Sequence, residues 1–262
     1  MTLRPVLVFA AASLGFAALA DTADAATFYF IRHAESTANA GTASTPEEML
    51  DPPLTDLGKQ QALDLVRTLA DTPLTHVYVS GYQRTALTIA PTVADHGLTP
   101  VVKPEIGEWL FGGSLSGDLY AQLAEVMGKW AAGDTAAKIE GAESLDELNA
   151  RVLPGYREII ERHKDEDGVV AIVGHGGSIG WTMPFFASNV PSGYGLAHGL
   201  RNTAIVQVVL DSQGNPLVSD WDGTPFDAAG PIPAPVPLPA SGVLLVAAIG
   251  GLGAARRFRK AA

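Results

Sequence analysis

Hydrophobic residues along this chain gather into short continuous runs that alternate with longer segments of helical periodicity. Runs rich in β-branched and aromatic residues, typical of strands buried on both faces, lie near residues 27–32, 76–80, 99–103, 168–174 and 203–210. Helical patterns cover residues 61–69, 84–94, 120–131, 145–163 and 178–186. This alternation predicts an α/β fold, a three-layer α/β/α sandwich with a mostly parallel central sheet.

Local signals add detail to this outline. Thr55 or Asp56 is expected to cap the helix that contains residues 61–69. Pro154 is expected to kink or split the helix at residues 145–163, because proline removes a backbone donor from the helix interior. Residues 114–164 interrupt the regular alternation, and we expect this insertion to lie over the sheet edge and to shape access to it.

Three of the predicted strands end in residues that can bind an anion. Arg32 and His33 follow the first strand, Arg84 follows the second, and His175 follows the strand at 168–174. In open α/β sheets, ligands sit in the crevice beyond the carboxyl ends of the strands. These residues are therefore expected to form a single site.

Six short motifs, in a fixed order between about residues 27 and 210, surround these positions. They are Arg32-His33-Ala34-Glu35-Ser36 with Asn39, Leu54 to Ala62, Ser80 to Thr85, Glu108 to Gly112, Gly141 to Ser144, and Gly174 to Gly177. Together they resemble the signature of the histidine phosphatase (phosphoglycerate mutase-like) superfamily. Ala34 and Ala142 stand where that family has glycine, and Ala38 where Trp is common; we expect these departures to affect substrate preference more than chemistry.

The resemblance implies a phosphoglycerate mutase-like fold and hydrolysis of phosphate monoesters through a phosphohistidine at His33, without a cofactor. Neutral imidazole can attack phosphorus without a metal, and neighbouring cations oppose its protonation. Arg32 and Arg84 offer planar forks that match phosphate oxygens. His175, in its protonated form, would donate a further hydrogen bond to the phosphate.

Two further groups are expected to serve this chemistry. The backbone amides of Gly176 and Gly177 open a helix, which is a favourable place for an anion. Glu108 is expected to act as the general acid and base, with Trp109 and Phe111 providing an apolar setting that would raise its pKa.

Other polar residues near the motifs keep more than one interpretation. Asn39 is expected either to bind phosphate or to satisfy a turn, and Glu105 is a second candidate for the acid. Glu35 and Glu143 are expected to be structural partners of nearby arginines or amides. His198 is expected to belong to a loop.

A metal site is not expected. Metal sites usually gather three or four His, Cys or carboxylate ligands, often with two close in sequence. This chain has no cysteine and no H-x-x-x-H pattern, and arginines adjoin the two motif histidines. His76, His96 and His163 are expected at the surface or at the start of a strand.

Both ends of the chain are predicted to lie outside the phosphatase domain, which is assigned to residues 26–221. Residues 1–25 have a cation, an apolar stretch and a small-x-small site, which together indicate a secretory signal peptide cleaved after Ala25 or Ala20. Residues 222–235 are rich in Pro, Gly and Ala and are predicted to be a linker.

Residues 236–262 combine a Val-Pro-Leu-Pro-Ala motif, an apolar run and a basic end. This tail resembles the VPLPA-type relatives of PEP-CTERM sorting signals, which exosortase-like membrane proteases process in Gram-negative bacteria. The alternative is a plain C-terminal membrane anchor, although the apolar run is short for a bilayer span of about 20 residues. Either way we expect an exported protein that is periplasmic, tethered to the membrane by the tail, or on the cell surface.

Composition narrows the possible partners. The 262 residues are 47% hydrophobic, enough for one sizeable domain, and the formal net charge is −11. Such an acidic chain is a poor nucleic-acid binder. The expected partner is a phosphorylated small molecule or a phosphoprotein. Two rival functions remain at this point: a phosphoglycerate-type mutase, and a surface-tethered protein that binds phosphate without catalysis.

Overall fold

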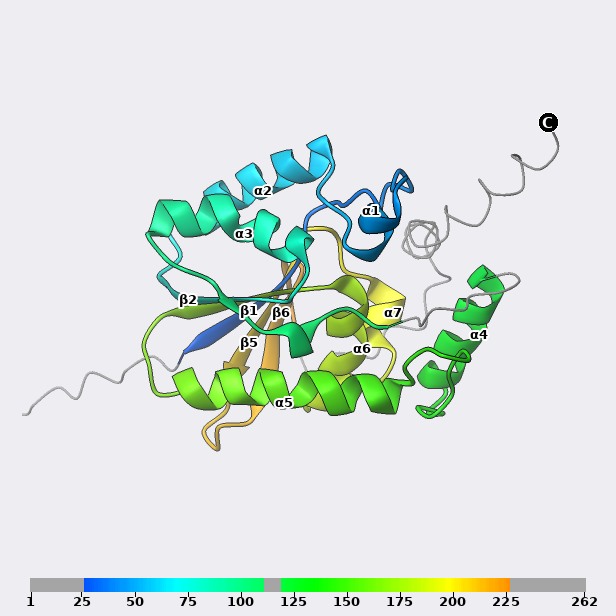
Figure 1. The fold of residues 1–262 in the computed structure, drawn as a ribbon. Coiled ribbons are helices and arrows are strands. Elements are labelled where there is room, and N and C mark those ends of the chain that lie inside the picture. Colours follow the sequence, from blue (N-terminus) through cyan, green and yellow to red (C-terminus); the bar gives the residue numbers. More distant parts are fainter. Residues whose placement is uncertain (1–25, 111–118, 227–262) are drawn as a thin grey trace, which may run out of the picture.

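The computed structural model describes residues 26–110 and 119–226, which form a sheet with helices on both faces (Figure 1). In these residues the sheet has seven strands in the order β3-β2-β4-β1-β5-β6-β7. The strands are β1 (Thr27–Arg32), β2 (Leu74–Val79), β3 (Val101–Val102), β4 (Val169–Gly174), β5 (Ile205–Leu210), β6 (Pro216–Trp221) and β7 (Thr224–Pro225). The helices are α1 (Pro46–Leu50), α2 (Asp56–Leu69), α3 (Gln83–His96), η1 (Pro104–Ile106), α4 (Leu119–Ala131), α5 (Leu145–His163), α6 (Gly176–Phe186) and α7 (Tyr194–His198).

The predicted α/β fold class is confirmed, and the sheet divides into two halves. Strands β3, β2, β4 and β1 are parallel, whereas β5, β6 and β7 continue the sheet in antiparallel fashion from β1. The parallel half contains all of the strands that lead into the family motifs. Because β2, β4 and β1 are neighbours, their carboxyl ends lie side by side at one edge.

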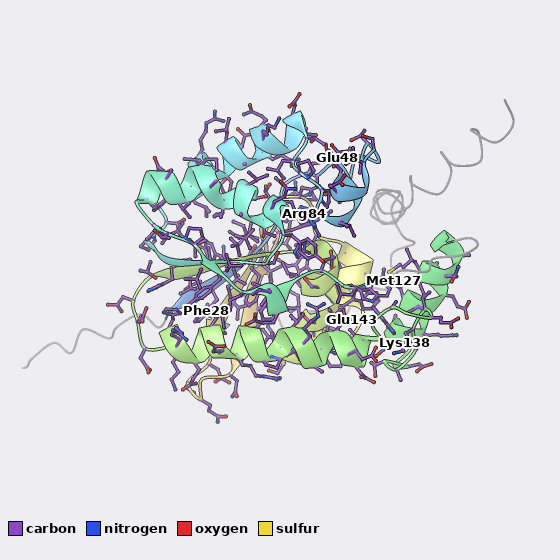
Figure 2. All side chains as sticks on the ribbon, in the orientation of Figure 1. Phe28, Glu48, Arg84, Met127, Lys138 and Glu143 are labelled. Atoms are coloured by element: carbon purple, nitrogen blue, oxygen red, sulfur yellow. The ribbon has the colours of Figure 1, made fainter. Side chains whose placement is uncertain are left out.

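Two hydrophobic layers sandwich the parallel strands. Successive side chains of a strand point to opposite faces, so Phe28 and Phe30 of β1 enter the core shared with α5 and α6, whereas Ile31 enters the core shared with α2 and α3. Phe28 is visible between the sheet and α5 (Figure 2). Phe30 packs edge-on against Tyr156 of α5, with the ring centroids 4.8 Å apart.

Most predicted helices agree with the structure, and the caps explain where they begin. Thr55 caps α2, since its Oγ1 accepts a hydrogen bond from the backbone N–H of Gly58. Helix α5 begins with a capping box formed by Ser144 and Glu147. The expectation that Pro154 splits this helix is wrong: α5 runs unbroken through Pro154, with buried residues before and after the proline, and it packs against α6 and η1.

The C-terminal part of the sheet was not expected from the sequence. Strands β6 and β7 follow β5, and the backbone N–H of Phe226 donates to the carbonyl of Ser219 at 2.8 Å. The sheet therefore continues past Asp222, where the linker is predicted to begin. The predicted signal peptide at 1–25, the predicted tail at 236–262 and most of the predicted linker lie outside the described residues. Among the helices that the structure describes, none has the length and apolarity needed to cross a bilayer.

Candidate active site

Four ionisable side chains from three strand ends meet at the carboxyl edge of the parallel strands. Arg32 is the last residue of β1 and His33 follows it, Arg84 lies in the first turn of α3 after β2, and His175 follows β4 as the N-cap of α6. Each is at most 7% exposed. The structure therefore brings together the residues that the sequence places at these strand ends.

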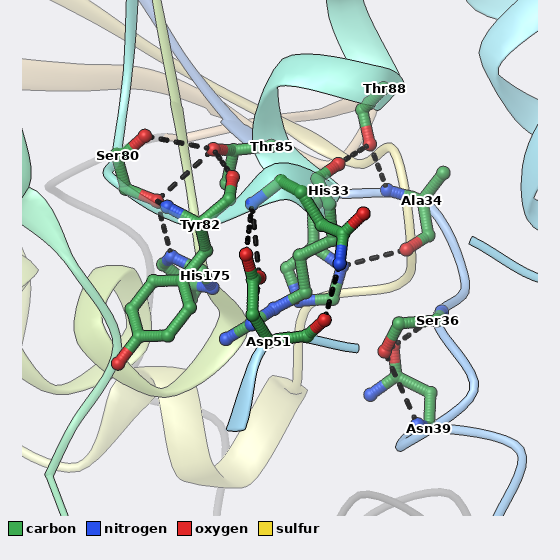
Figure 3. A network of polar contacts seen from close by, with 12 residues as sticks. His33, Ala34, Ser36, Asn39, Asp51, Ser80, Tyr82, Thr85, Thr88 and His175 are labelled. Atoms are coloured by element: carbon green, nitrogen blue, oxygen red, sulfur yellow. Dashed lines mark hydrogen bonds and ion pairs between the residues drawn. The ribbon is translucent and has the colours of Figure 1, made fainter. Parts of the chain in front are cut away.

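His33 is held with one ring nitrogen anchored and the other turned to a cation. Its Nδ1 lies 2.7 Å from the backbone carbonyl of Ala34 (Figure 3), and its Nε2 lies 3.3 Å from Nε of Arg84. A carbonyl only accepts and a guanidinium only donates, so these contacts assign the proton to Nδ1 and leave a lone pair on Nε2. Burial, then Arg84 and Arg32, lower the pKa of His33 well below its usual value. The ring is thus neutral at physiological pH.

His175 packs edge-on against His33, with the ring centroids 5.2 Å apart. Its Nε2 lies 2.8 Å from Oγ of Ser80, and its Nδ1 is buried without a hydrogen-bond partner among the described residues. Burial, followed by Arg84, lowers the pKa of His175 well below its usual value. The protonated form expected for His175 therefore disagrees with its buried position beside Arg84. A neutral ring still offers one N–H, and Nδ1 is the nitrogen free to present it.

Arg32 is fixed at one end and open at the other. Its Nη1 donates a hydrogen bond to the carbonyl of Leu200, whereas the buried Nε has no hydrogen-bond partner in the part of the chain that the structure describes. A Cβ at Gly176 would lie 2.9 Å from that Nε, so glycine is needed here for the guanidinium to fit. Burial lowers the pKa of Arg32 to about 10, which leaves the side chain charged at neutral pH. An unpartnered buried donor is suited to bind an oxyanion.

Arg84 is positioned by neighbours that the sequence analysis did not single out. Its guanidinium carbon lies 4.2 Å from the ring centroid of Tyr82, and one Nη1 is 4.0 Å from Oδ1 of Asp51. Asp51 also accepts a hydrogen bond from the backbone N–H of Gln83 at 3.0 Å (Figure 3). These contacts hold the arginine beside His33 while the ion pair offsets part of its charge.

Glu108 reaches the same edge from the loop after η1. Its Oε1 accepts hydrogen bonds from the backbone N–H groups of Ser178 at 2.7 Å and Trp109 at 2.9 Å, and Oε2 accepts one from Gly177 at 3.2 Å. The apolar setting expected for this carboxylate is therefore wrong, because backbone amides surround it. A Cβ at Gly177 would lie 2.5 Å from Oε1. Thus the carboxylate of Glu108 occupies the amide-lined N-terminus of α6 at Gly177, where the sequence predicts that phosphate binds.

The loop that carries Glu108 is held in place by the ion pair between Arg151 and Glu143. Arg151 of α5 donates to both carboxylate oxygens of Glu143, at 2.7 and 2.8 Å, and to the backbone carbonyls of Glu105, Gly107 and Glu108. Glu143 is thus a structural partner of an arginine, as the sequence predicts. The side chain of Glu105 instead pairs with Lys103 at 3.1 Å.

Asn39 satisfies a turn in this structure. Its Oδ1 accepts hydrogen bonds from the backbone N–H and the hydroxyl of Ser36, both at 3.1 Å. Asn202 connects this turn to the site, because its amide donates to the backbone carbonyl of His33 at 2.9 Å and lies 3.4 Å from Oδ1 of Asn39. Glu35 accepts a hydrogen bond from Thr55 and so ties the same segment to α2.

Sequence reasoning missed several supporting residues for different reasons. Ser80 and Tyr82 lie inside the Ser80-to-Thr85 motif, so the motif itself was the available signal. Asp51, Asn202 and Arg151 reach the site only through long-range folding, and no local pattern marks them. The expectation that His198 belongs to a loop is wrong, because His198 is the last residue of α7, where it is exposed and stacks on Tyr194 with the ring centroids 3.8 Å apart.

Known proteins resemble both the sequence and this geometry. Phosphoserine phosphatase 1 of Hydrogenobacter thermophilus is 30% identical over 55% of this chain and 68% of its own length. The probable phosphoglycerate mutase GpmB of Yersinia pestis is 29% identical over 74% of this chain and 88% of its own length. Among solved structures, mycobacterial glucosyl-3-phosphoglycerate phosphatase shares the fold with a TM-score of 0.62 at 21% identity, over 76% of this chain and 99% of that one. The family model of the histidine phosphatase superfamily (branch 1) matches residues 28–222, and the chain belongs to this superfamily.

Proposed function

We propose that this protein is an exported phosphomonoesterase that works through a phosphohistidine at His33 and needs no metal ion. The observation that carries the proposal is the buried Nε2 of His33, which carries no proton and whose lone pair accepts a hydrogen bond from Arg84 Nε at 3.3 Å. A neutral nucleophile surrounded by arginines attracts a phosphate dianion and can attack it. The phosphatase among the sequence relatives supports the same activity class.

In the first step, Nε2 of His33 attacks the phosphorus atom, a P–N bond forms and the P–O bond to the alcohol breaks. Arg32, Arg84, the Nδ1–H of His175 and the backbone amide of Gly176 bind the non-bridging oxygens. The departing oxygen takes a proton from Glu108. Oε2 is the oxygen that carries this proton, because it accepts one amide hydrogen bond whereas Oε1 accepts two.

In the second step, water attacks the phosphohistidine and gives its proton to the Glu108 carboxylate. The P–N bond breaks, inorganic phosphate leaves, and His33 returns to its neutral form. Phosphoryl transfer of this kind depends mainly on positioning and on cations at the phosphate oxygens. Asn39 would join those donors only if its free amide nitrogen turns toward the phosphate, since its Oδ1 is occupied by the turn.

The test is to trap the intermediate. The purified protein is mixed with an aryl phosphate, quenched in alkali, where phosphohistidine survives, and mapped by mass spectrometry. We expect a phosphoryl group on His33, and neither label nor turnover in His33→Gln. Turnover at the wild-type rate in His33→Gln, or a label on another residue, would overturn the proposal.

The acceptor of the phosphoryl group distinguishes hydrolase from mutase. A relative carries the name of a probable phosphoglycerate mutase, so this activity is the second candidate. Free phosphate released from phosphoglycerate without isomer formation supports the phosphatase, whereas interconversion of the two isomers supports the mutase. Phosphate binding without any turnover would identify the non-catalytic alternative.

Export and anchoring are proposed from the chain ends alone. We propose that residues 1–25 direct the protein out of the cytoplasm and that an exosortase-like protease cuts near residues 236–240, with the tail holding the protein in the membrane until then. In a host without the protease, the protein should stay membrane-bound with its domain in the periplasm. Mass spectrometry of the native C-terminus decides between the proposals, because an intact basic end after residue 256 would leave only the plain anchor.

A further inference from the structure

Three potential metal ligands converge at the edge of the sheet opposite the phosphate site. Nδ1 of His163 lies 2.8 Å from Oε2 of Glu166, and Nδ1 of His76 lies 3.4 Å from the same oxygen. One ligand atom from each residue falls within 4.8 Å of the other two. His76 lies near the start of β2, and the other two residues precede β4. The cluster is thus separated from His33 and His175 by the length of the strands.

The fold directs these side chains toward one another. The register of β2 against β4 shifts between Leu74 and His76, and such bulges re-aim side chains. Because alternate side chains of a strand point to the same face, His76 and Tyr78 share the face that packs on α5, where His163 occupies the last turn. The two imidazole centroids are 4.0 Å apart with an interplanar angle of 35°. His163 is 3% exposed, so its expected surface position is wrong.

The surroundings of the cluster resemble those of a metal site in three respects. Nε2 of His163 lies 2.8 Å from the hydroxyl of Tyr78, the kind of outer contact that orients a ligating histidine. Nδ1 of His76 is buried and has no hydrogen-bond partner in the described part of the chain, although it faces a carboxylate. Such a ring nitrogen has neither a proton donor nor a cation to satisfy its lone pair. Exposed Asp165 and Asp167 flank Glu166, so the local charge favours a cation.

We propose that His76, His163 and Glu166 bind a divalent transition metal, with Zn²⁺ as the expected ion and water as the fourth ligand. Bond lengths of about 2.1 Å in a tetrahedral zinc site place the ligand atoms roughly 3.4 Å apart. The separation of His76 Nδ1 from Glu166 Oε2 already has this value, and the 2.8 Å hydrogen bond from His163 to Glu166 has to open by about 0.6 Å. The proton of His163 is then carried by Nε2 instead of Nδ1, and this N–H donates a hydrogen bond to the hydroxyl oxygen of Tyr78.

Such an ion would join β2, the end of α5 and the segment before β4, without touching the phosphate site. The role is structural, and the proposal is independent of the proposed phosphatase activity. The competing explanation is a His163–Glu166 ion pair with His76 merely stacked on it. The two differ in one respect, because only a metal site requires His76 as a ligand.

The test is a Zn²⁺ titration of the purified protein by calorimetry, followed by thermal unfolding with zinc and with EDTA. We expect one zinc per chain and a higher Tm with zinc, since a ligand that binds the folded state stabilises it. His76→Gln and Glu166→Gln should each lose this binding and the Tm shift. Both side chains are more than 40% exposed, so neither change threatens the core.

Two controls exclude other histidines. His198→Gln removes an exposed histidine remote from the cluster, and His33→Gln removes one from the phosphate site; both should bind zinc like the wild type. Tyr78→Phe should weaken binding roughly 10–100-fold, as loss of an outer contact does. The proposal is overturned if the wild type shows neither heat nor a Tm shift with zinc, or if any of the three cluster variants, at His76, Glu166 or Tyr78, binds as tightly as the wild type.

Discussion

Nε of Arg84 lies 3.3 Å from Nε2 of His33, so a cation faces the lone pair that is proposed to attack phosphorus. This contact serves the resting enzyme in two ways. It opposes protonation of the imidazole, and it keeps a guanidinium where the phosphate oxygens are expected. When a substrate binds, the dianion can take over the guanidinium hydrogen bonds and leave Nε2 free to react.

Removing this cation should raise the pKa of His33 and slow catalysis. In Arg84→Gln we expect the pKa to rise but to stay below its usual value, because burial is the larger cause of the depression. The value of kcat/KM should fall about 10²–10³-fold, the usual cost of losing one donor to a transition-state oxyanion. NMR titration and steady-state kinetics measure the two effects. Arg67→Gln, at an exposed position of α2, is the matched control and should change neither.

Substitution of Glu108 should depend on the leaving group. Glu108→Gln should slow hydrolysis of alkyl phosphates by about 10²–10⁴-fold, the typical contribution of general acid catalysis, and that of nitrophenyl phosphate much less. Leaving groups of low pKa need no proton, which is the reason for the difference. Glu105→Gln is the control, since Glu105 pairs with Lys103. Equal slowing of both substrate classes by Glu108→Gln would exclude Glu108 as the acid.

The parallel half of the fold could be predicted because its central strands contain continuous apolar runs. β1 and β4 are buried on both faces, so hydrophobicity alone marks them. β6 and β7 were missed because β6 has no continuous apolar run and β7 has only two residues, and Pro225 falls in the Pro-, Gly- and Ala-rich segment that is predicted to be a linker. Helix α5 is the opposite kind of error, because a break was expected that does not occur. Tertiary packing there outweighs the unfavourable helix propensity of Pro154.

Residues of the proposed site could be predicted from the sequence only where a charged or nucleophilic residue directly follows a strand. Arg32, His33 and His175 are of this kind, because parallel strands deliver their ends to one edge. The environment of Glu108 could not be anticipated, since its amide partners come from Gly177 and Ser178, about 70 residues away along the chain. Sequence neighbours such as Trp109 suggested an apolar setting for Glu108. In the structure, however, the indole N–H of Trp109 donates a hydrogen bond to the backbone carbonyl of Glu143.

Chelation should leave the phosphatase rate unchanged. Catalysis as proposed uses arginines and backbone amides where metallophosphatases use ions, so hydrolysis of an aryl phosphate in excess EDTA should proceed at the full initial rate. The assay is made at a temperature well below Tm, because the proposed zinc site would affect stability rather than rate. A loss of activity that added divalent ions restore would contradict the metal-free mechanism.

Stability should fall as the pH drops below the ordinary histidine range. His33 and His175 are buried with pKa values lowered well below 6.5, mainly by desolvation. Between those lowered values and 6.5 the unfolded chain binds more protons than the folded one, so the free energy of unfolding rises with pH in this window. The stabilisation is fully present above pH 6.5 and is lost progressively on acidification, by up to about 1.4 kcal/mol per pH unit for each histidine. Urea unfolding at a series of pH values measures this slope.

In His33→Gln the slope should be shallower by the contribution of one histidine. His198→Gln, which removes an exposed histidine, is the control and should retain the wild-type slope. Equal slopes in His33→Gln and the wild type would show that His33 does not resist protonation in the folded state.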